Sequence, residues 1–532
     1  MNALDYIVVV VYLAGLLGMG FMWRSQQSEK DFFLGGKNLG WFPLTLSTMA
    51  TQLSAISFIS APAFVGMREG GGLQWLAYEF SVPLAMILVA WLILPALYRS
   101  GVVSIYDFLE RRYGNSTRYL VSFLFQIVRS FGTGIMVYAV CIILQAMFDM
   151  PMWMSLLVVG IITLVYSTSG GMKAVVYGDV IQMILIFVGL ILVAIFAMAE
   201  LGSAEVFWES VDPARFDAVN VTAFGFSNDE FGLLPMIFGG FVLYASYYGC
   251  DQTQAQRAMS ARSISDVRKL LFANGVMRFP LVLLYCITGL IVGVVVQNSP
   301  ELMAQIPADK PDYMMPIFIL EHMPNGIIGL LLVAILSAAM SSLSSTVNSL
   351  AAVSLNDLNA LGVIDSSDTQ KSVIHARYAS LIWGVVILVL SFYADSIAPT
   401  VIEAINKVGS ALYGPILGVF LMAMFRNKVT ATGANVGLLA GMFLNLYLWI
   451  FEPQIFWMWW NFIGLIVTVG VAFAVSQMTN QNGVFAALGE TESTHDTKDF
   501  SVRHLSLILV TVFVVIVAIS WIISIAGRSL AV

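Results

Sequence analysis

A run of small hydroxyl side chains interrupts an apolar segment in the second half of the chain. Residues 338–349 read AAMSSLSSTVNS. Because residues three and four positions apart share a helix face, Ser341, Ser344 and Ser345 would converge on one side of a helix. Such hydroxyls can bond to carbonyls one turn back or join two helices. They can also bind a hard cation, which prefers oxygen ligands.

One carboxylate, Asp179, could accompany these hydroxyls as a ligand of the cation. A charged side chain inside a membrane span costs roughly 2.5 kcal/mol or more, so it normally faces a partner or a cavity. Asp179 lies about 7 Å along a helix that starts at Ala174, which leaves open a position at the membrane interface. The sequence alone allows both interpretations.

Two arginines, Arg129 and Arg278, also fall within apolar segments. The planar guanidinium fork suits a carboxylate in bidentate geometry. Arg129 could therefore form a salt bridge with Glu79 or Asp251, or contact a solute. Arg278 lies about two turns from a basic loop, and its long side chain could extend back to that loop.

Two apolar segments contain polar stretches where the middle of a membrane should lie. Residues 47–55 read STMATQLSA and residues 244–252 read YASYYGCDQ. Backbone groups that leave a helix at this depth must find partners in protein or in a watery cavity. Two interrupted spans, five spans apart, are typical of an inverted repeat of five plus five helices. The alternative is two ordinary helices with hydrogen-bonded hydroxyls.

Membrane helices must position these residues. The chain has 532 residues, of which 59% are hydrophobic and 11% charged, whereas soluble proteins carry about 25% charged residues. Apolar stretches of about 20 residues, the length that crosses a bilayer, follow one another along the chain. This pattern excludes a soluble enzyme, a nucleic-acid binder and a secreted disulfide scaffold. Cys141, Cys250 and Cys286 match no zinc or redox spacing and are interpreted as core residues.

Apolar windows separated by polar gaps predict an all-α membrane protein with fourteen spans. The spans start near Leu4, Phe42, Leu73, Tyr119, Met152, Ala174, Phe231, Leu270, Ile327, Tyr378, Thr400, Thr430, Gln454 and Leu505. Five regions are expected: a first helix with a cytoplasmic loop (1–40), a first five-helix repeat (41–200), an acidic extracytoplasmic loop (201–230), a second five-helix repeat (231–428), and three C-terminal helices with a cytoplasmic linker (429–532).

The basic residues predict the orientation of these spans. Most of the 25 Lys and Arg residues, Arg257 among them, fall in alternate gaps, which the positive-inside rule assigns to the cytoplasm. Both termini are therefore predicted to face away from the cytoplasm. We expect an integral protein of a bacterial inner membrane, with the lipid bilayer as its surroundings and no nucleic-acid partner.

Several segments together resemble the sodium:solute symporter family. They are DFFLGGK at residues 31–37, LSA at 53–55, GGMKAVV at 170–176, DVIQ at 179–182, DQTQAQR at 251–257, SSLSS at 341–345 and NS at 348–349. The resemblance covers almost the whole chain. It implies a LeuT-type fold with the inverted repeats in spans two to six and seven to eleven. It also implies a functional monomer.

The same resemblance implies one or two sodium ions as coupling ions. The main site would consist of the carbonyls of Ala50, Leu53 and Ala338 and the hydroxyls of Ser341 and Ser342. A second site, as in members that resemble the sialic acid symporter, would consist of Asp179, Ser341, Ser344 and Ser345. Unwound carbonyls and helix hydroxyls would form an uncharged cage for one ion, while a carboxylate would compensate the second.

The resemblance places a set of polar and aromatic residues around a central solute cavity. They are Gln52, Ser54, Ser57, Glu79, Arg129, Tyr244, Tyr247, Arg278 and Asn406. Glu79 matches a sugar-binding position of sodium/galactose symporters, and Arg129 matches a carboxylate-binding position of the sialic acid symporter. Tyr247 falls where an inner gate is expected.

The activity that the resemblance implies is sodium-coupled symport of a small polar solute by alternating access. A carboxylate-bearing sugar similar to sialic acid, or another organic anion, is the leading solute. A neutral sugar or polyol is the alternative. The competing classes are a channel, a proton-coupled carrier with Asp179 as its proton site, and a membrane sensor.

Overall fold

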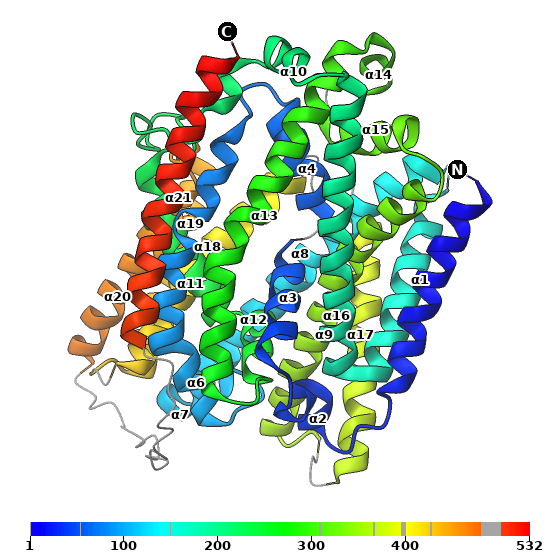
Figure 1. Cartoon of the computed structure of the whole chain (residues 1–532). Helices are drawn as coiled ribbons and strands as arrows, with labels where there is room; N and C mark the ends of the chain where they lie inside the picture. Colours follow the sequence, from blue (N-terminus) through cyan, green and yellow to red (C-terminus); the bar gives the residue numbers. More distant parts are fainter. Residues whose placement is uncertain are drawn as a thin grey trace.

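The chain forms a bundle of membrane helices (Figure 1). The computed structural model describes residues 2–53, 55–148, 150–307, 310–364, 368–394, 401–425, 428–479 and 502–531. Within this part the chain is helical, and its strand-like pairing is limited to two isolated bridges. Eleven described helices are long and apolar enough to cross a membrane, or thirteen spans when each of two bent pairs counts as one. The prediction of an all-α membrane protein is confirmed.

The first part of the bundle runs from α1 to the short elements after α9. Its elements are α1 (Ala3–Met22), α2 (Glu29–Leu34), η1 (Gly35–Lys37), α3 (Trp41–Gln52), α4 (Ala55–Gly66), η2 (Leu73–Glu79), α5 (Val82–Leu88), η3 (Val89–Ile93), α6 (Leu94–Ser100), α7 (Tyr106–Tyr113), α8 (Asn115–Phe148), α9 (Met152–Leu201), α10 (Ala204–Ser210) and η4 (Pro213–Phe216).

The second part begins with α11 and ends near the C-terminus. Its elements are α11 (Leu233–Gly249), α12 (Gln252–Met259), α13 (Ile264–Asn298), α14 (Pro300–Gln305), η5 (Pro311–Tyr313), α15 (Met314–His322), α16 (Ile327–Ala360), α17 (Thr369–Phe392), α18 (Val401–Met424), α19 (Ala431–Phe451), α20 (Met458–Met478) and α21 (Val502–Leu530). The predicted cytoplasmic linker before the last span, Gly483 to Asp499, lies outside the described residues.

Polar capping residues start two helices earlier than the apolar windows predict. The α13 helix begins after Ser263, whose side chain accepts the backbone N–H of Asp266. The α17 helix begins after Asp368, whose carboxylate accepts two backbone N–H groups of the first turn. A cap satisfies donors that a helix start leaves without partners, so polar first turns extend these helices beyond their apolar cores.

The α9 helix contains two spans joined by a reversal. Its 50 residues would extend about 75 Å as one straight helix, more than twice the thickness of a bilayer core. Gly171 breaks the helix with φ 57° and ψ −152°. A methyl group added at Gly178 would lie 3.6 Å from the Tyr166 ring, although a straight helix would separate these residues by about 18 Å. Counting α9 twice brings the described spans to fourteen, the number that the apolar windows predict.

Both termini lie at the same end of the bundle, together with α10, α14 and α15 (Figure 1). Asp5 in α1 accepts the backbone N–H groups of Gly326 at 2.6 Å and Gly329 at 2.9 Å, at the start of α16. Arg528 in α21 forms an ion pair with Asp217. An even number of spans requires this arrangement, and the side of the membrane on which the termini lie stays a prediction.

The acidic loop between the two halves uses carboxylates to organise its own backbone. The Asp212 side chain caps η4 by accepting the N–H of Ala214. Asp229 accepts the backbone N–H groups of Gly225 and Ser227, each at 2.9 Å. These hydrogen bonds lower the pKa of Asp229 to about 2. These carboxylates thus stabilise local turns within the loop.

Two spans are broken in the middle, as the polar stretches predict. The α3 and α4 helices meet at an angle of 58°, and α11 and α12 meet at 56°. Leu53 leaves the helix at the first break, with φ −80° and ψ 79°. Asp251 is extended at the second break, and its carboxylate caps α12 by accepting the Thr253 N–H at 2.8 Å. Both breaks fall inside the residue ranges that the sequence singles out.

Glycines allow α4 and α13 to pack backbone against backbone. Gly289 and Gly293 on α13 face Pro62 and Gly66 on α4, and a methyl group added at Gly289 would lie 2.5 Å from the Pro62 carbonyl oxygen. Small residues at such crossings let membrane helices approach closely. The second half of the first broken span, α4, is therefore held tightly to α13.

We predict that Gly289→Ala destabilises the protein by about 1–3 kcal/mol, because overpacking must push two backbones apart. The melting temperature in detergent measures this effect. Gly470→Ala is the matched control, since no atom lies within 4 Å of a methyl group added there. Equal melting temperatures for the two variants would contradict the tight crossing.

Candidate functional site

The end of α3 and the hydroxyl face of α16 are adjacent in the centre of the bundle. Thr51 Oγ1 lies 3.3 Å from Ser345 Oγ, and Ser342 Oγ donates to the Ala338 carbonyl at 3.3 Å. Leu53 and Ser342 line the same cavity. The residues predicted for the main sodium site are all buried: Ala50, Leu53, Ala338, Ser341 and Ser342. Their elements thus meet as the resemblance implies, while their role stays a prediction.

The carboxylate of Asp179 is fully buried and accepts hydrogen bonds from two neighbouring helices. Ser341 Oγ on α16 donates to Oδ1 at 2.6 Å, and Ser47 Oγ on α3 donates to Oδ2 at 2.6 Å. Ser344 Oγ donates to the Ser341 carbonyl at 3.1 Å. Asp179 thus faces protein partners, as one interpretation expects, while its depth in the membrane stays a prediction.

Arg257 is a site residue that the sequence interpretation missed. It was assigned to a cytoplasmic gap, yet it lies on α12 with 1% of its surface exposed. Its Nη2 atom lies 3.0 Å from Asp179 Oδ2 and also donates to Ser345 Oγ. Hydropathy averaged over a window cannot distinguish a basic residue at the end of a polar helix from one in a loop. The preceding run DQTQAQR was the available signal, because it resembles the family's motif.

A central cavity of about 180 Å³ lies beside these groups. Seven of the nine residues predicted to surround the solute line it: Gln52, Ser57, Glu79, Arg129, Tyr244, Tyr247 and Arg278. Ser54 lies outside the described residues, and so does the side chain of Asn406 on α18. The cavity contacts both broken spans, and Leu53 and Ser342 connect it to the predicted main sodium site.

Glu79 and Arg278 form a buried ion pair on one side of the cavity. Arg278 Nη2 lies 2.5 Å from Glu79 Oε1, and Arg278 Nη1 donates to Tyr248 Oη at 3.0 Å. Tyr248 in turn donates to Gln52 Oε1. The guanidinium also stacks over the Tyr244 ring, 5.2 Å from its centroid. The expectation that Arg278 extends to the cytoplasmic loop is wrong, because the closer carboxylate of Glu79 holds it.

Arg129 also lines the cavity and is paired with Asp251. Its Nε atom lies 3.5 Å from Asp251 Oδ2 and donates to Thr253 Oγ1 at 3.1 Å. The guanidinium lies 5.4 Å from the centroid of the Tyr247 ring, and Tyr247 Oη accepts from Gln254 Nε2 at 2.9 Å. Of the alternatives that the sequence left open for Arg129, the Asp251 salt bridge is observed.

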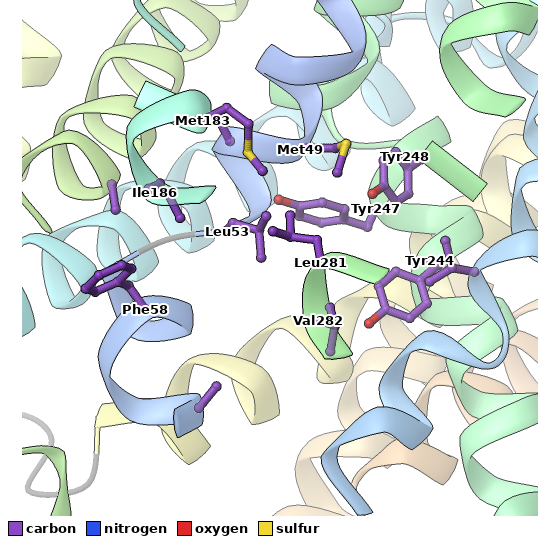
Figure 2. Close-up of a cluster of buried hydrophobic side chains, with 14 of the residues drawn as sticks. Met49, Leu53, Phe58, Met183, Ile186, Tyr244, Tyr247, Tyr248, Leu281 and Val282 are labelled. Carbon is purple, nitrogen blue, oxygen red and sulfur yellow. The ribbon is translucent and has the colours of Figure 1, made fainter. Parts of the chain in front are cut away.

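Aromatic rings that the sequence interpretation did not single out complete the cavity wall. They are Trp75, Tyr78, Tyr285, Tyr413 and Trp457. Trp75 Nε1 donates to Tyr285 Oη at 2.8 Å. Figure 2 shows apolar and aromatic side chains of α3, α4, α9, α11 and α13 gathered around the break that follows Leu53. Aromatic residues are common in any membrane helix, so only the fold could bring these five together.

Two broken spans that enclose a cavity between buried ion pairs define a membrane carrier of the LeuT type. The sodium:solute symporter family model matches residues 32–441. The chain therefore belongs to the sodium:solute symporter family and is an integral membrane protein.

Relatives with known names agree with this assignment. A putative sodium-dependent multivitamin transporter of Drosophila melanogaster is 29% identical over 85% of this chain and 76% of its own length. The human sodium/iodide cotransporter is 30% identical over 84% of this chain and 69% of its own length. A sodium-coupled monocarboxylate transporter 1 of Xenopus laevis is 27% identical over 84% of this chain and 70% of its own length.

A solved structure has the same fold. It is a Na+-coupled sialic acid symporter in a substrate-bound outward-open state, with a TM-score of 0.80 and 22% identity. The alignment covers 90% of this chain and 98% of that chain. The predicted LeuT-type fold is thus confirmed.

We predict that Glu79→Gln lowers the unfolding free energy by about 3–5 kcal/mol, because it leaves the Arg278 guanidinium buried without its counter-charge. Adding Arg278→Met to Glu79→Gln should restore most of this loss. Thermal unfolding in detergent measures both variants. Lys371→Gln, which removes an exposed ion pair with Asp368, should leave the melting temperature unchanged. A double variant no more stable than Glu79→Gln would contradict the pairing argument.

Proposed function

We propose that this chain is a sodium-coupled symporter that imports a small organic anion, such as a carboxylate-bearing sugar. The observation that carries the proposal is the connection between the predicted main sodium site and the solute cavity. Leu53 and Ser342 belong to the first and line the second. An ion at this position places positive charge beside the solute, which favours an anion.

The broken spans supply the means for coupling. Sodium at the carbonyls of α3 and the hydroxyls of α16 holds the broken span against the continuous α16 helix. It thereby favours the conformation in which these two elements are in contact. Solute then binds between Arg129 and Arg278. Tyr247 and the Arg129–Asp251 pair close the inner side, and their separation releases the solute. Each ligand shifts the equilibrium only by its difference in affinity for the two states.

Arg129 is the proposed anchor for a carboxylate. It lines the cavity, and a guanidinium can bind a carboxylate in bidentate geometry. The named relatives act on iodide, monocarboxylates or vitamins, and the structural relative binds a sialic acid. Their range supports an anionic solute for this chain.

A neutral sugar or polyol is the second candidate, and one atom favours it. Glu79 Oε2 is buried and has no hydrogen-bond partner among the described residues. A buried acceptor without a partner costs free energy, which a solute hydroxyl would recover. Proton coupling through Asp179 is less favoured, because Arg257 and two serine hydroxyls already contact both of its carboxylate oxygens.

Sodium coupling predicts that Ser342→Ala raises the sodium concentration for half-maximal binding about tenfold, which corresponds to about 1.4 kcal/mol. Sodium-dependent thermal stabilisation of the purified protein, with choline as the reference cation, measures this change. Ser337→Ala is the control, since that hydroxyl on the same helix bonds to Tyr12. Identical sodium dependence in the Ser342→Ala and wild-type proteins would exclude Ser342 from the ion site.

The solute class predicts that sialic acids or small monocarboxylates stabilise the protein only when sodium is present. Arg129→Gln should abolish that stabilisation while sodium alone still stabilises. The measurement is a thermal-shift panel of carboxylates, neutral sugars and polyols, each with and without sodium. Stabilisation by a neutral sugar instead, lost in Glu79→Gln, would establish the second candidate. Stabilisation independent of sodium would contradict both.

The remaining expectations belong to the same proposal. We place both termini and the acidic loop outside the cytoplasm of a bacterial inner membrane, because the positively charged loops lie at the other end of the bundle. We also propose that a single chain functions alone, as the resemblance to the family implies.

A further inference from the structure

The Arg257 guanidinium occupies a closed polar pocket formed by four elements. Its Nε atom donates to Ser47 Oγ at 2.8 Å, and Nη1 donates to the Thr253 carbonyl at 2.5 Å. Its Nη2 atom reaches Asp179 Oδ2 at 3.0 Å and Ser345 Oγ. With 1% of its surface exposed, this cation has no route to solvent, so these oxygens must stabilise its charge.

The same oxygens belong to the second sodium site that the resemblance implies. Asp179 and Ser345 are two of its four residues, and one nitrogen atom of Arg257 contacts both. A sodium ion that bound both Asp179 Oδ2 and Ser345 Oγ would lie close to the position of Nη2. A sodium ion and the Arg257 guanidinium in contact with the same buried oxygens would repel each other strongly. The guanidinium and a sodium ion therefore compete for one position.

The charge balance favours the guanidinium. Asp179 carries the one negative charge, and Arg257 is its one cationic neighbour in the contacts of the described residues. A displaced guanidinium would be left buried without a counter-charge, and removing one partner from a buried pair is strongly unfavourable. Arginine keeps its proton in proteins, so it cannot escape the cost by becoming neutral.

We propose that Arg257 is the permanent counter-cation of Asp179 and excludes the second sodium ion, so that this symporter binds one sodium ion per cycle. The inference rests on the proposed function, because it takes the main sodium site as given. It assigns Arg257 the role of a specificity-determining residue for ion stoichiometry. It also makes Asp179 a positioning residue that holds α12 against α3, α9 and α16.

Counting bound ions tests this directly and needs no solute. Saturation binding of radiolabelled sodium to purified protein should give one ion for the wild type. Arg257→Gln removes the competing cation but leaves Asp179 with the serine hydroxyls, and should bind two. Arg257→Lys keeps the charge and should bind one. The combined Asp179→Asn and Arg257→Gln variant removes both charges and should also bind one.

The outcomes separate this inference from the proposed function. Two ions in the wild type, reduced to one in the combined variant, would overturn the exclusion while confirming sodium binding. One ion in a folded Arg257→Gln variant would also overturn it, because the freed oxygens would not attract sodium. Absence of sodium binding in every protein would instead refute the proposed function. If Arg257→Gln does not fold, the wild-type and combined variants still decide the question. Ser342→Ala added to the combined variant should raise the sodium concentration for half-maximal binding of the remaining ion about tenfold.

Discussion

The cost of a buried charge governs the centre of this structure. Three carboxylates lie deep in the bundle, and each has a guanidinium partner: Asp179 with Arg257, Glu79 with Arg278, and Asp251 with Arg129. Each pair joins segments that are distant in the sequence, and each includes a residue on or beside a broken span. Because an unpaired charge in the membrane interior is so unfavourable, these pairs constrain how η2, α8, α9, α12 and α13 pack together.

The broken spans depend on rigid neighbours as well as on charges. The second half of the first broken span, α4, is held to α13 through glycines, where the two backbones touch. The second half of the other broken span, α12, is held through Arg257. Close backbone packing at the glycines and the buried hydrogen bonds of Arg257 both tolerate only small shifts. Any motion of these halves is therefore expected to occur as a movement of whole segments.

Much of the architecture followed from the sequence, because hydropathy and polar interruptions report directly on membrane depth. The spans, the two breaks and the small hydroxyl face of α16 are properties of short segments. The resemblance to a family supplied most cavity residues. The predictions that were wrong or incomplete concern side chains whose positions depend on contacts between distant segments. The sequence interpretation assigns Arg257 to a loop and leaves Arg278 a possible route to one, since a sequence window cannot show that Asp179 and Glu79 lie closer. The aromatic wall around Trp75 and Trp457 was missed for the same reason.

The paired charges around the cavity also bear on how voltage acts on transport. The charges of Arg129, Arg278, Glu79 and Asp251 sum to zero, so these four groups would carry no net charge across the bilayer if the proposed carrier reorients empty. A membrane potential, which is worth about 2.3 kcal/mol per elementary charge at 100 mV, then acts on the bound ligands alone. One sodium ion with a monoanion makes the loaded step electroneutral as well. Accumulation of the solute would then follow the sodium concentration ratio and be insensitive to the electrical component of the gradient.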